Sequence, residues 1–157
     1  MTRIQFFAPG IPKAQPRPRA FARKMGNTFV ARVYDAGTAE NFKSQIALAG
    51  RPHIPLVPLQ GPLSVTFHFF FPRLKAHFRS NGALKPDAPY WHTSKPDTEN
   101  VIKAALDAMT ILRFWSDDKQ ACKVEATKTY SDRPGVEIIV EPLSEAVEQA
   151  EQKRLAV

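Results

Sequence analysis

Hydrophobic residues recur with the period of an α-helix between residues 100 and 112. One side of this predicted helix is apolar and consists of Val101, Ile102, Ala105, Leu106, Ala108, Met109 and Leu112. The other side is polar and carries Asn100, Lys103, Asp107 and Thr110. Such a helix buries its apolar face against a core and exposes its polar face to solvent, where the side chains can contact a ligand.

A second pattern, rich in aromatic and β-branched residues, predicts strands. The strongest example is Leu63–Phe71, which alternates loosely, ends at Pro72 and is expected to be a central strand. Further strands are predicted over Arg3–Ala8, Ala121–Tyr130 and Val136–Glu141, the last two joined through residues 131–135. A helix is predicted over roughly residues 39–49, with Thr38 as its cap and Gly50 at its end.

Two segments lack a clear period. Residues 11–35 combine three prolines with basic side chains, which predicts an extended, basic and partly mobile loop containing a short strand over Thr28–Val33. Its basic residues include Lys13, Arg17, Arg19, Arg23 and Lys24. Residues 73–96 form a second long basic loop, and loops of this length in compact domains are usually functional or disordered.

Together these elements predict one α/β (α+β) domain over residues 1–142, followed by a tail over residues 143–157 in which Ser144–Arg154 forms a surface helix. The chain has 157 residues, of which 43% are hydrophobic and 24% charged, as in ordinary globular proteins. It has no apolar run of 18 residues and no signal-like N-terminal stretch, so a cytoplasmic protein is expected. Cys122 is the only cysteine, which excludes an intrachain disulfide and a thiolate metal cage.

The net charge of +7 favours a polyanionic partner, and nucleic acid is the leading candidate. Against this basic background, acidic residues concentrate at Asp97, Glu99, Asp107, Asp117 and Asp118. Asp97 and Glu99 are separated by one residue and precede the predicted helix, where two carboxylates on one side favour a hard cation such as Mg²⁺. Lys103, one helical turn later, can neutralise charge that develops on a phosphate. The pattern therefore favours a metal-dependent nuclease.

Simpler explanations exist for each group. Asp97 and Glu99 could cap the helix, Asp117 and Asp118 could form a solvated turn, and Lys103 could pair with Asp107 on the surface. A short connection could also return Asp117 and Asp118 to the start of the helix, although the sequence alone does not fix this.

The run KPDTENVIKAALDAMTILRFWSDDKQ, residues 95–120, resembles the signature of RusA-type Holliday junction resolvases. That pattern is approximately PD-x-DN-x-x-K-x-x-x-DAL, followed by a W/F-x-DD-x-Q turn. The N-terminal GIPKAQPRPRAF is similar to a basic segment of the same family. The resemblance implies a small mixed β-sheet flanked by helices, and a homodimeric, Mg²⁺-dependent endonuclease (Mn²⁺ being an alternative) that resolves four-way DNA junctions in recombination and repair.

The same resemblance assigns roles to individual residues. It implies that Asp97, Glu99 and Asp118 are catalytic metal ligands, with Asp117 as a further ligand or its neighbour, and that Lys103 is the essential lysine. Supporting positions are Asn100, Asp107 and Gln120. Lys13, Arg17, Arg19, Arg23 and Lys24 are candidates for phosphate contact. A bacterial or phage-infected cell is the implied setting.

One departure is Glu99, because the family usually has Asp there; glutamate still offers two oxygens to a hard cation. Two alternatives stay open: a non-catalytic branched-DNA-binding protein, and a nuclease of the same chemistry that acts on flaps, forks or other branched DNA. His92 could approach the phosphate, but a loop histidine is more often only solvated. Phe67, Phe69, Phe70 and Phe71 suit core packing better than insertion between DNA bases.

Overall fold

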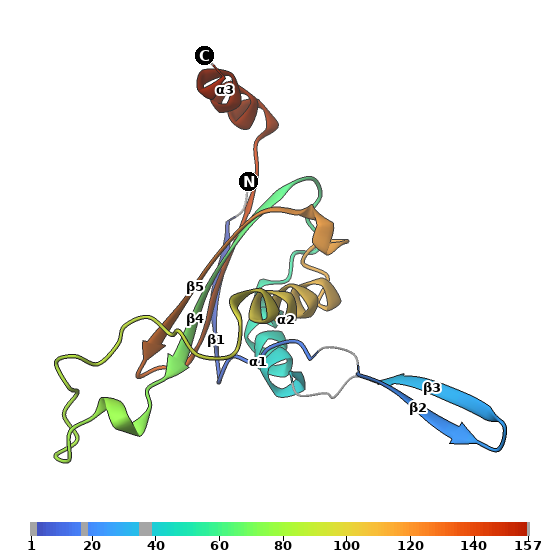
Figure 1. The fold of residues 1–157 in the computed structure, drawn as a ribbon. Coiled ribbons are helices and arrows are strands. Elements are labelled where there is room, and N and C mark those ends of the chain that lie inside the picture. Colours follow the sequence, from blue (N-terminus) through green and yellow to red (C-terminus); the bar gives the residue numbers. More distant parts are fainter. Residues whose placement is uncertain (1–2, 17–18, 35–38, 157) are drawn as a thin grey trace.

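The computed structural model describes residues 3–16, 19–34 and 39–156. Within them the chain forms a single mixed α/β body, as the sequence predicts, with a hairpin and a C-terminal helix that extend away from it (Figure 1). The strands are β1 (Ile4–Pro9), β2 (Arg19–Met25), β3 (Thr28–Tyr34), β4 (Leu63–Pro72), β5 (Ala121–Ser131) and β6 (Gly135–Pro142). The helices are α1 (Glu40–Gly50), α2 (Thr98–Ile111) and α3 (Glu145–Leu155), with short 3-10 turns η1 (Arg51–His53), η2 (Lys75–His77) and η3 (Asp118–Gln120). None of the described helices is both long and apolar enough to cross a membrane.

The main sheet has the strand order β1-β6-β4-β5. β4 runs parallel to β5, whereas β6 is antiparallel to both β1 and β4. β5 and β6 follow each other in the chain but are not neighbours, because β4 lies between them. The segment from residue 73 to residue 120 is therefore the crossover that parallel neighbours require.

β4 lies inside the sheet, between β6 and β5, and its buried hydrophobic residues alternate with half-exposed ones along its whole length. The buried positions, Leu63, Val65, Phe67, Phe69 and Phe71, are 0–3% exposed and face the core. Both α1 and α2 lie on one side of the sheet and cover this face (Figure 1). Burial of aromatic and branched side chains between sheet and helices supplies the main stabilisation of the fold.

α2 begins and ends close to its predicted limits, and its buried residues, Val101, Ala104, Ala105, Ala108 and Met109, come from the predicted apolar side and its margin. After it, Arg113 adopts a left-handed conformation with φ 65°, and the N–H of Phe114 donates to the carbonyl of Met109 at 3.2 Å. The left-handed residue and this hydrogen bond end the helix with a sharp turn of the chain, after which Phe114 and Trp115 are buried.

α1 also lies where the sequence predicts it, but its N-cap is Ala39 and no side chain caps it. Thr38, the predicted cap, is outside the described residues. Gly50 is the last helical residue and not a left-handed stop. A Cβ atom there would stand 3.0 Å from Cζ of Phe6, so close packing against β1 explains the glycine.

Within residues 11–35, the short strand predicted over Thr28–Val33 is confirmed as β3, but the loop expected before it is wrong, because Arg19–Met25 forms a second strand, β2. β2 and β3 pair over their full lengths as an antiparallel hairpin, with Met25 opposite Thr28 and Gly26 at φ 64° in the turn. Glycine adopts that conformation without steric cost, which allows so tight a connection. The hairpin extends from the body in Figure 1 and exposes Met25 and Phe29, 62% and 69% accessible.

The long loop after β4 is ordered against the outer edge of the sheet. Trp91 forms a bridge with Thr129, the N–H of Tyr130 donates to Tyr90 and the N–H of His92 donates to Lys128. These bonds occupy backbone groups that an edge strand would otherwise leave unpaired. They also place the segment before α2 beside the end of β5.

Candidate active site

Asp97 occupies the N-cap position of α2, but its side chain makes no capping hydrogen bond. Its backbone carbonyl accepts from the N–H groups of Asn100 and Val101, each at 3.2 Å. The residue is exposed, so its carboxylate stands at the positive end of the helix dipole and is accessible to a ligand. The structure thus gives the side chain of Asp97 no capping role.

Three further predicted residues follow Asp97 on the first two turns of α2. Glu99 and Lys103 are exposed, and Asn100 is half-buried. Lys103 lies six residues after Asp97, which corresponds to about 9 Å along a helix axis. A flexible lysine side chain can span that distance towards a group bound near Asp97.

Lys128 of β5 is a site residue that sequence reasoning missed. Its Nζ atom donates to the carbonyl oxygens of Ser94 at 2.9 Å and Pro96 at 2.5 Å, on the segment that leads into Asp97. Burial lowers the pKa of Lys128, while the nearby carboxylate of Asp97 opposes that shift. Lys128 therefore positions the backbone before Asp97 and adds a positive charge beside it.

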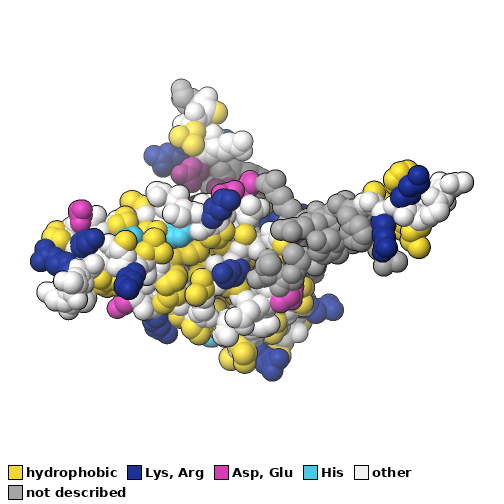
Figure 2. Space-filling view, turned by 60° about the horizontal axis from the view of Figure 1, so that its bottom comes forward, with side chains coloured by type: hydrophobic (Ala, Val, Ile, Leu, Met, Phe, Trp, Pro, Cys, Tyr) yellow, Lys and Arg dark blue, Asp and Glu magenta, His cyan; other side chains and the backbone are white. Residues whose placement is uncertain are grey.

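A cavity of about 800 Å³ opens beside Asp97. It lies between residues 11–14, the end of β4 and the start of α2, and Asp97 and Asn100 are among its lining residues. His92 also lines it, stacked on Phe71 with ring centroids 3.8 Å apart. Figure 2 shows histidine side chains among hydrophobic ones on one face of the molecule, with lysine and arginine side chains around them.

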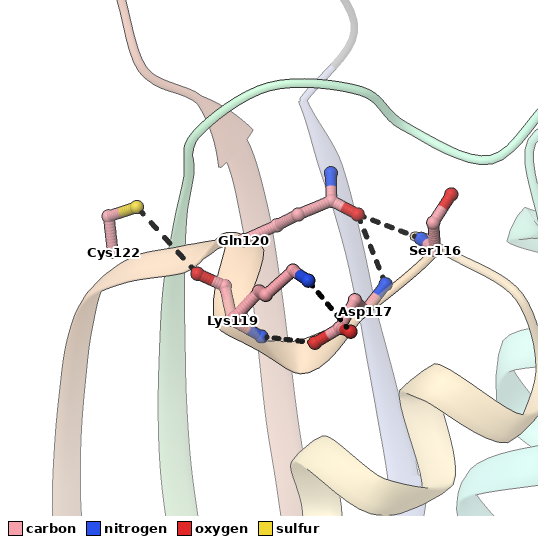
Figure 3. Close-up of polar contacts among 5 residues, drawn as sticks. All are labelled: Ser116, Asp117, Lys119, Gln120 and Cys122. Atoms are coloured by element: carbon pink, nitrogen blue, oxygen red, sulfur yellow. Dashed lines mark hydrogen bonds and ion pairs between the residues drawn. The ribbon is translucent and has the colours of Figure 1, made fainter.

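Asp118 lies in the turn η3 and Asp117 lies directly before it. Gln120 organises this turn through hydrogen bonds to the backbone around Asp117 (Figure 3). The N–H of Lys119 donates to Oδ1 of Asp117 at 3.0 Å, and Oε1 of Gln120 accepts from the N–H groups of Ser116 and Asp117. The bond from the N–H of Lys119 is the main reason that the pKa of Asp117 lies below its usual value. Asp117 is thus the N-cap of η3, whereas Asp118 is exposed beside it.

This turn is at the opposite end of α2 from Asp97. Nε2 of Gln120 donates to the carbonyls of Leu59 and Gly61, just before β4, whereas the cavity beside Asp97 is lined by Phe71 at the end of β4. The 14 residues of α2 separate the two regions by about 20 Å. The chain therefore does not return Asp117 and Asp118 to the helix start, as a short connection could have done. No three acidic, histidine or cysteine residues within the described ranges form a group that could hold a metal ion.

The remaining predicted residues are distributed over the molecule. Asp107 pairs with Lys43 of α1 at 2.6 Å, and not with Lys103, the partner that the simpler explanation offered. Lys13 lines the cavity, and Arg23 and Lys24 are exposed on β2. Arg19 begins β2, and Arg17 lies outside the described residues.

A family comparison places the chain in a known class of nuclease. Residues 9–141 match the family model described as Endodeoxyribonuclease RusA, so the chain belongs to this family. The match confirms the resemblance seen in residues 95–120.

Two curated proteins are similar to this chain. The uncharacterized protein YqaN of Bacillus subtilis (strain 168) is 31% identical over 149 residues, which cover 90% of this chain and 97% of that protein. The crossover junction endodeoxyribonuclease rusA of Lactococcus phage r1t is 37% identical over 82 residues, which cover 52% of this chain and 53% of the phage protein.

Proposed function

We propose that this protein is a Mg²⁺-dependent endodeoxyribonuclease that resolves four-way DNA junctions as a homodimer, in DNA recombination and repair. The observation that carries the proposal is the accessible Asp97 carboxylate at the start of α2, without a capping bond and beside both Lys128 and a cavity. Membership of an endodeoxyribonuclease family and the name of the phage relative support the same activity.

The separation of Asp97 from Asp118 bears on how such a site is assembled. One chain does not bring these carboxylates together, and paired cuts in two opposed strands require two sites related by a two-fold axis. We therefore propose that Asp97 and Glu99 of one subunit meet Asp118 of a second copy, so that each site is shared. The carboxylate oxygens of this set suit Mg²⁺, with Mn²⁺ as an alternative.

When bound there, the cation would activate water and stabilise the charge on the phosphate. Asp97, Glu99 and Asp118 would hold it, and Lys103 would stabilise negative charge on the phosphate oxygens. Asp117 would act through its hold on the η3 turn, because its own carboxylate is engaged by Lys119. Lys13, Arg17, Arg19, Arg23 and Lys24 would contact backbone phosphates, which positions DNA without reading its sequence.

The first experiment uses a labelled synthetic four-way junction, incubated with Mg²⁺ and separately with EDTA. Symmetric cuts with Mg²⁺ and binding alone with EDTA are expected. The Asp97→Asn variant should bind the junction and leave it uncut. Binding without cleavage in every divalent metal would instead favour a non-catalytic DNA-binding protein, and preferential cutting of flaps or forks would change the substrate.

A second experiment tests whether the site is shared. Asp97→Asn and Asp118→Asn are each expected to be inactive, but mixed subunits should recover nicking. In a mixed dimer, one shared site has both substitutions and the other has neither. A mixture that remains inactive after subunit exchange would place both carboxylates in the same subunit's site. The Lys123→Met variant, changed at an exposed residue of β5, serves as a control for general effects of substitution.

A further inference from the structure

The cavity beside Asp97 has the size and lining of a ligand site. Its volume of about 800 Å³ falls within the range of small-molecule pockets in proteins. Much of its wall is apolar or aromatic and consists of Ile11, Pro12, Phe71, Leu74 and Tyr130. Such a wall favours a flat, uncharged group of moderate size over a chain of charged groups.

The charged residues around this apolar wall indicate which chemical groups a bound ligand carries beside its flat part. Lys13 and Lys95 both line the cavity and are both exposed, so their ammonium groups are available to anions at its mouth. Asp97, the proposed metal ligand, lines the same cavity. A nucleotide meets these conditions, because it joins a flat base to phosphates on either side.

His92 gives the wall a polar group with a fixed orientation. Its ring stacks on Phe71 at an interplanar angle of 14° and meets the ring of Tyr130 at 60°. Its Nδ1 atom is buried and has no hydrogen-bond partner among the described residues, so a ligand can hydrogen-bond this ring only at Nε2. Burial and the charge of Lys128 lower the pKa of His92, which favours the neutral ring.

From this arrangement we propose that the cavity binds one unpaired nucleobase of the cut strand, next to the phosphate at Asp97, and that His92 contacts the edge of that base. The inference rests on the proposed function and extends it to recognition of sequence. A base enters only after it leaves its stack, and this costs least where pairing is already weakened, as at a crossover. The cavity therefore couples the position of the cut to both the branch and the base.

The experiment places 2-aminopurine at each position near the crossover of a four-way junction, because its fluorescence rises when stacking is lost. Binding is measured in EDTA, so that the reading does not depend on cleavage. With the unchanged protein, one position should brighten severalfold. Leu74→Trp, which fills the cavity from a side chain that is 55% exposed, should abolish the rise and leave junction binding largely intact. Leu56→Trp, the same change at an exposed leucine outside the cavity lining, is the matched control.

His92→Phe preserves the stacking on Phe71 and removes the ring nitrogens. It should keep the fluorescence rise and reduce the preference among bases at that position, measured as a ratio of cleavage rates, by about tenfold. A junction that is bound and cut with no brightening at any position would overturn the base-binding proposal and leave the nuclease standing. Brightening that survives Leu74→Trp would also overturn it. A protein that does not bind the junction would refute the proposed function itself.

Discussion

The Nζ atom of Lys128 lies 2.9 Å from the carbonyl oxygen of Ser94, so a side chain of β5 holds the segment that leads into Asp97. A second bond to the carbonyl of Pro96 fixes the peptide directly before Asp97. The sheet and the start of α2 are thus joined at the carboxylate on which the proposed chemistry depends.

We predict that Lys128→Met lowers the single-turnover cleavage rate by about ten- to a hundredfold, because outer partners of a site typically contribute that much. Junction affinity in EDTA should change little, since Lys128 acts through Asp97. Lys123→Met, on an exposed position of the same strand, is the control and should cut at the normal rate. A Lys128→Met protein with full activity would leave the residue with a packing role only.

Asp107 is predicted to stabilise the fold and not to take part in cleavage. Its carboxylate accepts from Nζ of Lys43, whose side chain is only 12% exposed, across the contact between α1 and α2. Asp107→Ala leaves that ammonium group without its carboxylate partner, so unfolding by urea should show a loss of about 1–2 kcal/mol. A double-mutant cycle with Lys43→Met should recover part of the loss. A cleavage defect in a fully folded Asp107→Ala protein would contradict this assignment.

Gln120→Glu is predicted to disturb the turn that presents Asp118. The substitution keeps an acceptor for the N–H groups of Ser116 and Asp117, but it replaces the donor that now bonds the carbonyls of Leu59 and Gly61. Because a carboxylate oxygen would then face two carbonyl oxygens, the free energy of unfolding should fall by about 1–3 kcal/mol, measured by chemical unfolding. Gln60→Glu, at an exposed neighbouring position, should have a smaller effect.

The stability of the protein is predicted to fall below pH 6.5 partly because of His92. Its pKa is lowered from 6.5 by burial and by Lys128, so the unfolded chain binds the proton more readily than the folded one. The contribution of the neutral His92 ring to the free energy of unfolding is therefore complete above pH 6.5 and is lost as the pH falls below that value. Thermal midpoints at several pH values should decline less steeply for His92→Phe. Parallel curves would show that other groups dominate.

Much of the fold could be predicted because its central elements bury periodic hydrophobic residues. β4 and α2 each show one dominant period, and each lies within a few residues of its predicted limits. β2 was missed because the described side chains of the hairpin, at residues 22–31, are all exposed, so no alternation of buried and exposed positions marks this part of the strand. The position of β6 between β1 and β4 was not predictable either, since it depends on contacts between distant parts of the chain.

In the candidate site too, residues that are close in sequence could be predicted to lie together, and residues that only the tertiary fold brings together could not. Asp97, Glu99 and Lys103 are close in sequence, so helix geometry sufficed to associate them. The contact of Lys128 and the formation of the cavity require β5 to lie beside the loop before α2. No local sequence pattern indicates that the two segments are neighbours. The separation of Asp118 from Asp97 follows from the length of α2. The sequence indicated that length, but the grouping of these acids by their common chemistry suggested that they lie together.

The strand order also determines which parts of the chain can exist alone. If the chain were divided in the exposed loop near Gly82, the first half would contain β1 and β4 and the second β5 and β6. Every pairing in the order β1-β6-β4-β5 joins a strand of one half to a strand of the other. Neither half can therefore form any part of the main sheet by itself, and folding must await the C-terminal strands during synthesis. Two co-expressed halves would have to pair with each other to form the sheet.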